Sequence, residues 1–174
     1  MYRSSSLMPI LVLGATSLSA ACSGESAAER PQTLGPLRDA CELLPASEVE
    51  AIVGQPVQAE SLGASPVEFQ SYCGYLDTAG EDVFLETHVT WSGGTAAAQQ
   101  IVAENQANLE PIEGVGDGAW LSTYVGQHSL LVDGDVLVTF HTALLPGAAS
   151  QMMGDHSDLR RDFEAIARSV LSRL

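Results

Sequence analysis

The sequence predicts an α+β fold: an antiparallel sheet of about six strands with helices packed on one face. Apolar or alternating segments occur in two groups of three, and turn residues separate the members of each group. A helix-like segment precedes each group, and another closes the chain. The two halves therefore suggest duplicated αβββ units, although no sequence identity between them establishes a repeat.

A short first helix is expected within "DACELLPASEVEAIVGQPV". Ser47 and Glu50 have the spacing of a capping box, in which a hydroxyl and a carboxylate satisfy free backbone amides. Gly54 follows the last helical residue and provides the stop. One face of this helix carries three apolar residues, Val49, Ile52 and Val53.

The first group of strands follows this helix. A strand is expected over 57–62, and a second lies in "VEFQSYCGYLD", which alternates Phe69, Ser71, Cys73 and Tyr75 on one face. A turn over 77–80 leads into "EDVFLETHVTW", so the two segments predict a hairpin. One face of the third strand carries Val83, Leu85, Thr87 and Val89, and the other carries Phe84, Glu86, His88 and Thr90.

The second half begins at Gly93 and Gly94, after which Thr95 is expected to cap a mildly amphipathic helix in "AAAQQIVAENQANL". Beyond Pro111, turn signals at 126–127 and 133–134 divide "GVGDGAWLSTYVGQHSLLVDGDVLVTFHTAL" into three short strands. A final helix begins near Ser157. Its apolar residues recur at helical spacing, at Leu159, Phe163, Ile166, Val170 and Leu174.

Residues 1–21 have the arrangement of a signal peptide: Arg3 precedes a short apolar run that is too short to span a bilayer. Residues 18–22, "LSAAC", resemble the lipobox of bacterial lipoproteins, in which the cysteine receives lipid such as palmitate. Ser19 stands where the usual leucine would be. We therefore expect Cys22 to be lipidated, with an ordinary signal-peptidase cut after Ala21 as the alternative.

Residues 22–38 comprise the lipidated Cys22 and a flexible tether rich in Ser, Ala, Gly and Pro, and residues 39–174 form a single α+β domain. Lipidation of Cys22 leaves Cys41 and Cys73 as a pair in an exported protein, where disulfides persist. A disulfide between them is predicted. By restricting the unfolded chain, it would raise the free energy of unfolding by roughly 3.7 kcal/mol.

Several segments together resemble the lipoproteins of a domain of unknown function, family 3558, widespread in actinobacteria. They are "ACELLPASEVEAIVGQPV", "YCGYL", "EGVGDGAWLS", "VDGDVLVTF" and "FEAIARSVLSRL". The resemblance covers most of the mature chain. It implies an α+β lipoprotein of the cell envelope, without catalytic residues that carry over to this sequence.

The charge balance indicates which partners to exclude. Seven basic residues, all Arg, stand against 22 acidic ones, for a formal net charge of −15. Such a surface repels nucleic acid and anionic headgroups, so no nucleic-acid partner is expected, and contact with the membrane is expected through the lipid anchor. The predicted location is the outer face of the cytoplasmic membrane or an outer membrane.

Motifs that would indicate catalysis or a cofactor are weak. "GVGDGAW" lacks the ending of a phosphate loop, so Asp117 is expected in an Asx turn and Trp120 in the core or a groove. No GxSxG sequence is present. The histidines, His88, His128, His141 and His156, with Asp155 and Asp158 nearby, lack close ligand spacing, so no metal or cofactor is expected. His88 and His141 lie on predicted strands and could face each other.

The leading hypothesis is a non-catalytic envelope lipoprotein that binds an envelope protein or a small apolar ligand. An exposed aromatic cluster on the sheet face that the helices leave uncovered would be the recognition surface. Tyr72 and Tyr75 are among the aromatic residues that could contribute to it. The candidate ligand residues are Trp91, Trp120, Tyr124, His88 and His141. The alternatives are a metal-dependent or hydrolytic envelope enzyme that uses the His, Asp and Glu residues, and a passive structural spacer of the envelope.

Overall fold

The computed structural model describes residues 37–80, 82–124, 128–141 and 157–174, which belong to one compact unit, Leu34–Leu174. The expectations for the signal peptide, Cys22 and most of the tether lie outside the described residues, as do those for His156, Asp155 and the turn at 126–127. Within the described ranges, no helix has the length and hydropathy needed to cross a membrane.

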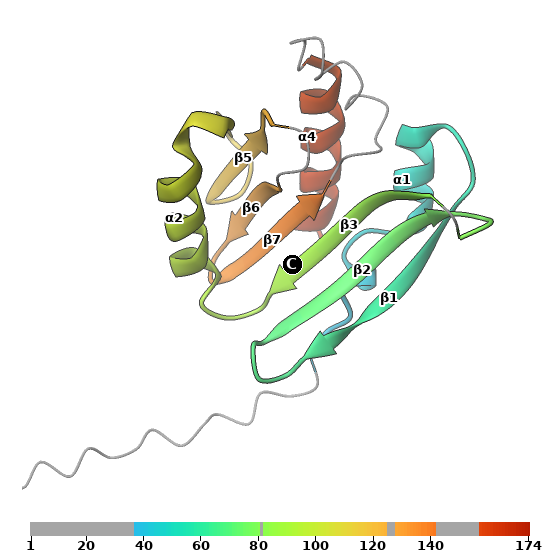
Figure 1. Cartoon of the computed structure of the whole chain (residues 1–174), viewed down its shortest axis with the longest axis horizontal. Helices are drawn as coiled ribbons and strands as arrows, with labels where there is room; N and C mark the ends of the chain where they lie inside the picture. Colours follow the sequence, from blue (N-terminus) through green and yellow to red (C-terminus); the bar gives the residue numbers. More distant parts are fainter. Residues whose placement is uncertain (1–36, 81, 125–127, 142–156) are drawn as a thin grey trace, which may run out of the picture. The chain divides into compact units, whose positions relative to one another are not determined.

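The fold is α+β and contains a seven-stranded antiparallel sheet with the order β1-β2-β3-β7-β6-β5-β4 (Figure 1). The strands are β1 Val57–Ser65, β2 Gln70–Asp77, β3 Val83–Thr90, β4 Leu109–Ile112, β5 Gly118–Ser122, β6 Ser129–Asp133 and β7 Val136–His141. The class predicted from the sequence is confirmed, with one more strand than expected. The additional strand is β4, which carries Pro111 and lies at the sheet edge, where a residue without an amide proton is tolerated.

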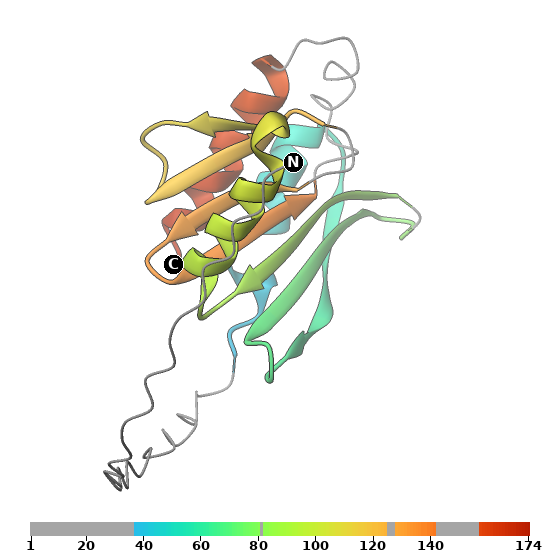
Figure 2. The ribbon, with the colours of Figure 1, turned by 60° about the vertical axis from the view of Figure 1, so that its left-hand side comes forward.

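Helices lie on both faces of the sheet, so the expectation of helices on one face is wrong (Figures 1 and 2). The helical elements are η1 Ala40–Glu42, α1 Ala46–Val53, α2 Gly94–Asn105, η2 Gln106–Asn108 and α4 Ser157–Leu171. α1 and α4 cover one face, and α2 covers part of the other. The reason lies in β6 and β7, whose consecutive apolar residues present both faces of the sheet for burial: Leu130, Leu131 and Val132, and Leu137 and Val138.

The main core lies between the sheet and the helices α1 and α4. Phe140 of β7 meets Phe163 of α4 edge to face, with ring centroids 5.6 Å apart. Tyr75 of β2 is fully buried, and its hydroxyl donates to the Leu44 carbonyl at 2.7 Å. Because burial penalises the phenolate, the pKa of Tyr75 is raised above its usual value. The predicted face of the last helix is confirmed, since its apolar residues from Leu159 to Val170 are buried here.

Two expectations about α1 have different outcomes. The helix begins at Ala46 with Pro45 as its N-cap and no side-chain cap, so the predicted capping box of Ser47 and Glu50 is wrong. Glu48 accepts hydrogen bonds from Ser169 and Arg173 at the end of α4 instead. The hydrogen bond from Ser169 is the main cause of the lowered pKa of Glu48. The stop at Gly54 is confirmed, since that residue has φ 75°.

The predicted disulfide is present and joins Cys41 in η1 to Cys73 in β2, with the Cα atoms 5.1 Å apart. Cys73 belongs to the buried face of β2, where the predicted alternation of Ser71, Cys73 and Tyr75 is confirmed. Phe69 does not share that face, because it lies in the turn before β2 with φ 54°. The disulfide therefore ties the point where the chain enters the domain to the interior of the sheet.

Replacing both Cys41 and Cys73 with alanine should lower the free energy of unfolding by about 2–4 kcal/mol, because the 32-residue separation leaves a long unrestrained loop in the unfolded chain. Guanidinium denaturation measures the difference. A reducing agent should produce the same loss in the native protein and leave the double variant unchanged. Equal stability of the native protein with and without reductant would show that the bond contributes nothing.

Candidate functional site

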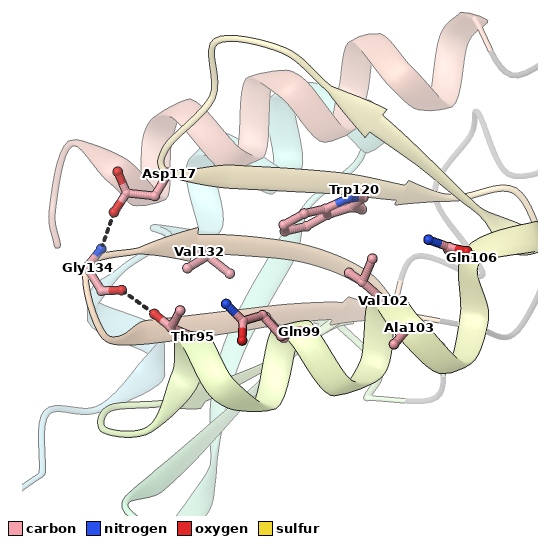
Figure 3. A pocket seen from close by; sticks show the side chains of 10 residues that line it. Thr95, Gln99, Val102, Ala103, Gln106, Asp117, Trp120, Val132 and Gly134 are labelled. Atoms are coloured by element: carbon pink, nitrogen blue, oxygen red, sulfur yellow. Dashed lines mark hydrogen bonds between the residues drawn. The ribbon is translucent and has the colours of Figure 1, made fainter.

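A pocket of about 410 Å³ lies between α2 and the strands β5 and β6 (Figure 3). Its helical wall consists of residues of α2 and the first residue of η2, which recur every three or four positions and so share one face: Thr95, Ala98, Gln99, Val102, Ala103 and Gln106. The remaining lining residues are Asp117, Trp120, Val132 and Gly134. The small side chains of α2 leave space at this helix face that longer ones would fill.

The wall opposite α2 is the half-buried indole ring of Trp120. This ring lies over Gly118 on the same face of β5, since a Cβ atom at Gly118 would come within 2.4 Å of it. Glycine at this position therefore lets the indole lie against its own strand and form a pocket wall. Core and groove were the two outcomes expected for Trp120, and its ring takes part in both: it packs against the buried cluster under α2 and lines the pocket.

The turn between β6 and β7 closes one end of the pocket (Figure 3). The Gly134 amide donates to Asp117 Oδ2 at 2.8 Å, and the Thr95 hydroxyl donates to the Gly134 carbonyl at 2.7 Å. The Asx turn expected at Asp117 is therefore replaced by a bond to a residue 17 positions along the chain. Thr95 does not cap α2, whose N-cap is Gly93.

The same turn fixes the start of α2. Asp135 accepts hydrogen bonds from the Gly93 amide at 2.8 Å and from the Ser92 hydroxyl at 3.2 Å. At Gly94 a Cβ atom would come within 2.3 Å of the Leu137 backbone nitrogen, so only glycine permits this approach of helix and strand. These contacts position α2, and with it the pocket.

A second group of polar and aromatic side chains lies on the same sheet face, on β2, β3 and β7 and at the residue that precedes β6. We call it the histidine cluster, and it consists of Tyr72, Glu86, His88, His128 and His141. Strand register explains it, because His88 pairs with Tyr72 on β2 and Glu86 pairs with His141 on β7. The His128 ring lies 5.5 Å from that of His88 and 5.4 Å from that of His141.

Burial disfavours the charged form of two of the three imidazoles, those of His88 and His128. Burial is the main cause that lowers the pKa of His88, opposed by Glu86, whose Oε2 lies 3.9 Å from His88 Nε2. The pKa of His128 is also lowered, first by burial and then by the charges of His88 and His141. Glu86 Oε2 lies 4.0 Å from His141 Nδ1 as well, so this carboxylate lies close to two rings.

The other predicted ligand residues do not join either group. Trp91 packs on the opposite side, against the core under α1 and α4, where its Nε1 donates to Ser71 Oγ at 2.9 Å. The Arg38 guanidinium lies 5.4 Å from the Trp91 ring centre. Tyr124 is 61% exposed beyond the end of β5, and Tyr75 is buried in the core. The single aromatic surface expected from the sequence is therefore not formed.

Two features of these sites are not predicted from the sequence. The pocket face of α2 mixes polar residues with small apolar ones, so its weak periodicity indicates a surface helix and not a pocket wall. His128 was not assigned to a ligand surface, because its neighbours His88 and His141 are distant in the sequence. The sequence feature that indicates an apolar pocket wall on α2 is the four-residue spacing of Ala98 and Val102, which places both on one helical face.

In the conformation shown, no three His, Cys, Asp or Glu side chains within the described ranges converge so as to hold a metal ion. Comparison with known proteins gives no match, because no family model, curated protein or solved structure is significantly similar to the chain. The resemblance to family 3558 stays a prediction. The function is therefore argued from the chemistry of the sites.

An NMR titration of the histidine rings should give a pKa below 6.5 for both His88 and His128. Replacing Glu86 with glutamine should lower the pKa of His88 further, because the carboxylate stabilises the imidazolium. For both histidines the folded pKa lies below the unfolded pKa, so protonation favours the unfolded chain. Their contribution to the free energy of unfolding is therefore complete above about pH 6.5 and is lost as the pH falls through the folded pKa values. Titration of His128 above pH 6.5 would contradict this description.

Proposed function

We propose that this protein is a non-catalytic envelope lipoprotein whose α+β domain binds a small, uncharged and largely apolar molecule in the pocket beside α2. The observation that supports this most is the pocket itself, where the Trp120 indole faces Ala98 and Val102 across about 410 Å³. Ligand sites of this type combine apolar walls with a few polar groups that orient the ligand.

The polar groups at the pocket favour a neutral ligand. Gln99 and Gln106 offer amides that both donate and accept hydrogen bonds, and Thr95 adds a hydroxyl. Asp117 is the single charged residue among the described residues of the lining, and its carboxylate already accepts a hydrogen bond from the Gly134 amide. An anionic ligand would meet this carboxylate and a net charge of −15 on the chain, so a fatty acid fits poorly.

The proposed location rests on the N-terminal sequence. A signal peptide over 1–21 would direct export of the chain. The lipidated Cys22 and the tether would then anchor the domain at the outer face of the cytoplasmic membrane or at an outer membrane. The Cys41–Cys73 disulfide suits an oxidising compartment. An envelope protein docked at the same domain remains the alternative partner, and the resemblance to family 3558 supports the envelope assignment.

Binding of the uncharged fluorophore N-phenyl-1-naphthylamine tests the pocket directly. Replacing Ala103, an exposed pocket residue on α2, with phenylalanine should weaken the affinity about tenfold, which corresponds to 1.4 kcal/mol, because the ring occupies the ligand space. Ala96→Phe is the matched control, since Ala96 is exposed on the same helix but does not line the pocket.

The measurement is the enhancement of probe fluorescence at increasing protein concentration, with circular dichroism to confirm that each variant is folded. Trp120→Ala should also weaken binding, whereas Trp91→Ala should not, because Trp91 lies on the other side of the sheet. The same affinity in the Ala103→Phe and Ala96→Phe variants would show that the probe binds elsewhere and would refute the proposed ligand site.

A further inference from the structure

The histidine cluster has no part in the proposed ligand site. Its three imidazoles come from β3, from the residue that precedes β6, and from β7, and they lie together on the part of the sheet face that α2 leaves uncovered. His88 and His141 keep about a third of their side-chain surface exposed, at 37% and 34%. Partly exposed rings of this kind are accessible to a small solute.

Two of the ring separations are close to those of imidazoles that share one metal ion. With zinc–nitrogen bonds of 2.0–2.1 Å and tetrahedral angles, two ligating rings have centroids about 5.2 Å apart. The observed separations are 5.5 Å for His88 and His128, and 5.4 Å for His128 and His141. Two of the three ring pairs are therefore already near the separation that a shared metal ion requires.

The ring orientation is the remaining difference. The rings are tilted by 46° and 48°, and their nitrogen atoms do not converge on one point in this conformation. The proposed site therefore requires the imidazole side chains to turn about their torsions until their nitrogen atoms face one point.

The charge of the site also suits a cation. Glu86 lies within 4.0 Å of a nitrogen of both His88 and His141, where it can stabilise bound positive charge or accept a hydrogen bond from a ring N–H.

We propose that His88, His128 and His141, together with Glu86, bind one divalent transition-metal ion of the class that prefers imidazole ligands, such as zinc. Magnesium and calcium prefer oxygen ligands, and the cluster offers one carboxylate, so neither should bind with comparable affinity. This site is independent of the pocket beside α2.

Isothermal titration calorimetry of the full chain, prepared without a histidine tag, tests the proposal with zinc chloride and with calcium chloride. One equivalent of zinc should bind, and calcium should not compete. His128→Ala should weaken zinc binding about tenfold or more without loss of the fold, because His128 lies outside the strands. Glu86→Gln should weaken it too, whereas Glu60→Gln, an exposed carboxylate on β1, should not.

NMR of the histidine rings in the unmodified chain tests the site without a substitution, so its result does not depend on whether a variant folds. Zinc should shift the resonances of His88, His128 and His141 together, at the same equivalence point, in the unmodified chain. The proposal is overturned if zinc does not bind, if it binds equally well to the His128→Ala chain, or if the three rings do not respond together. Binding of several equivalents that calcium displaces would indicate adventitious attraction to the acidic surface.

Discussion

The pairing of β3 with β7 is the constraint on which the rest of this structure depends. It joins the sheet of the first half, β1 to β3, to that of the second half, β4 to β7. Its register places Val89 opposite Val138, both directed to the core beneath α1 and α4, and Glu86 opposite His141 on the other face. Because successive residues alternate in direction, a slip of one residue would bury the histidines and expose the core.

Both candidate sites lie on one face because a single row of paired residues crosses the sheet. The row runs through five strands: Trp120 on β5, Leu130 on β6, Thr139 on β7, His88 on β3 and Tyr72 on β2. Neighbouring strands are about 4.8 Å apart, so the backbones of Trp120 and His88 are separated by about 14 Å. α2 covers the Trp120 end, and the turn at Gly134 and Asp135 fixes its position.

The sequence predicted the elements better than their arrangement. Alternation identified the buried face of β2, the capping glycine ended α1, and cysteine arithmetic gave the disulfide, because each signal is local or depends on one pair. The side of the sheet that α2 covers was not predictable, since β6 and β7 are apolar on both faces. The approach of His128 to His88 depends on the order of strands, which single-sequence periodicity does not encode.

The central claim is that one sheet face carries two separate binding sites, an apolar pocket and a cluster of imidazoles. A two-dimensional NMR titration of one sample, first with N-phenyl-1-naphthylamine and then with zinc, tests it most directly. The account predicts that the probe shifts amides of α2, β5 and β6, and that zinc then shifts the ring signals of His88, His128 and His141 without releasing the probe. Displacement of the probe by zinc, or one shared set of shifted residues, would contradict it.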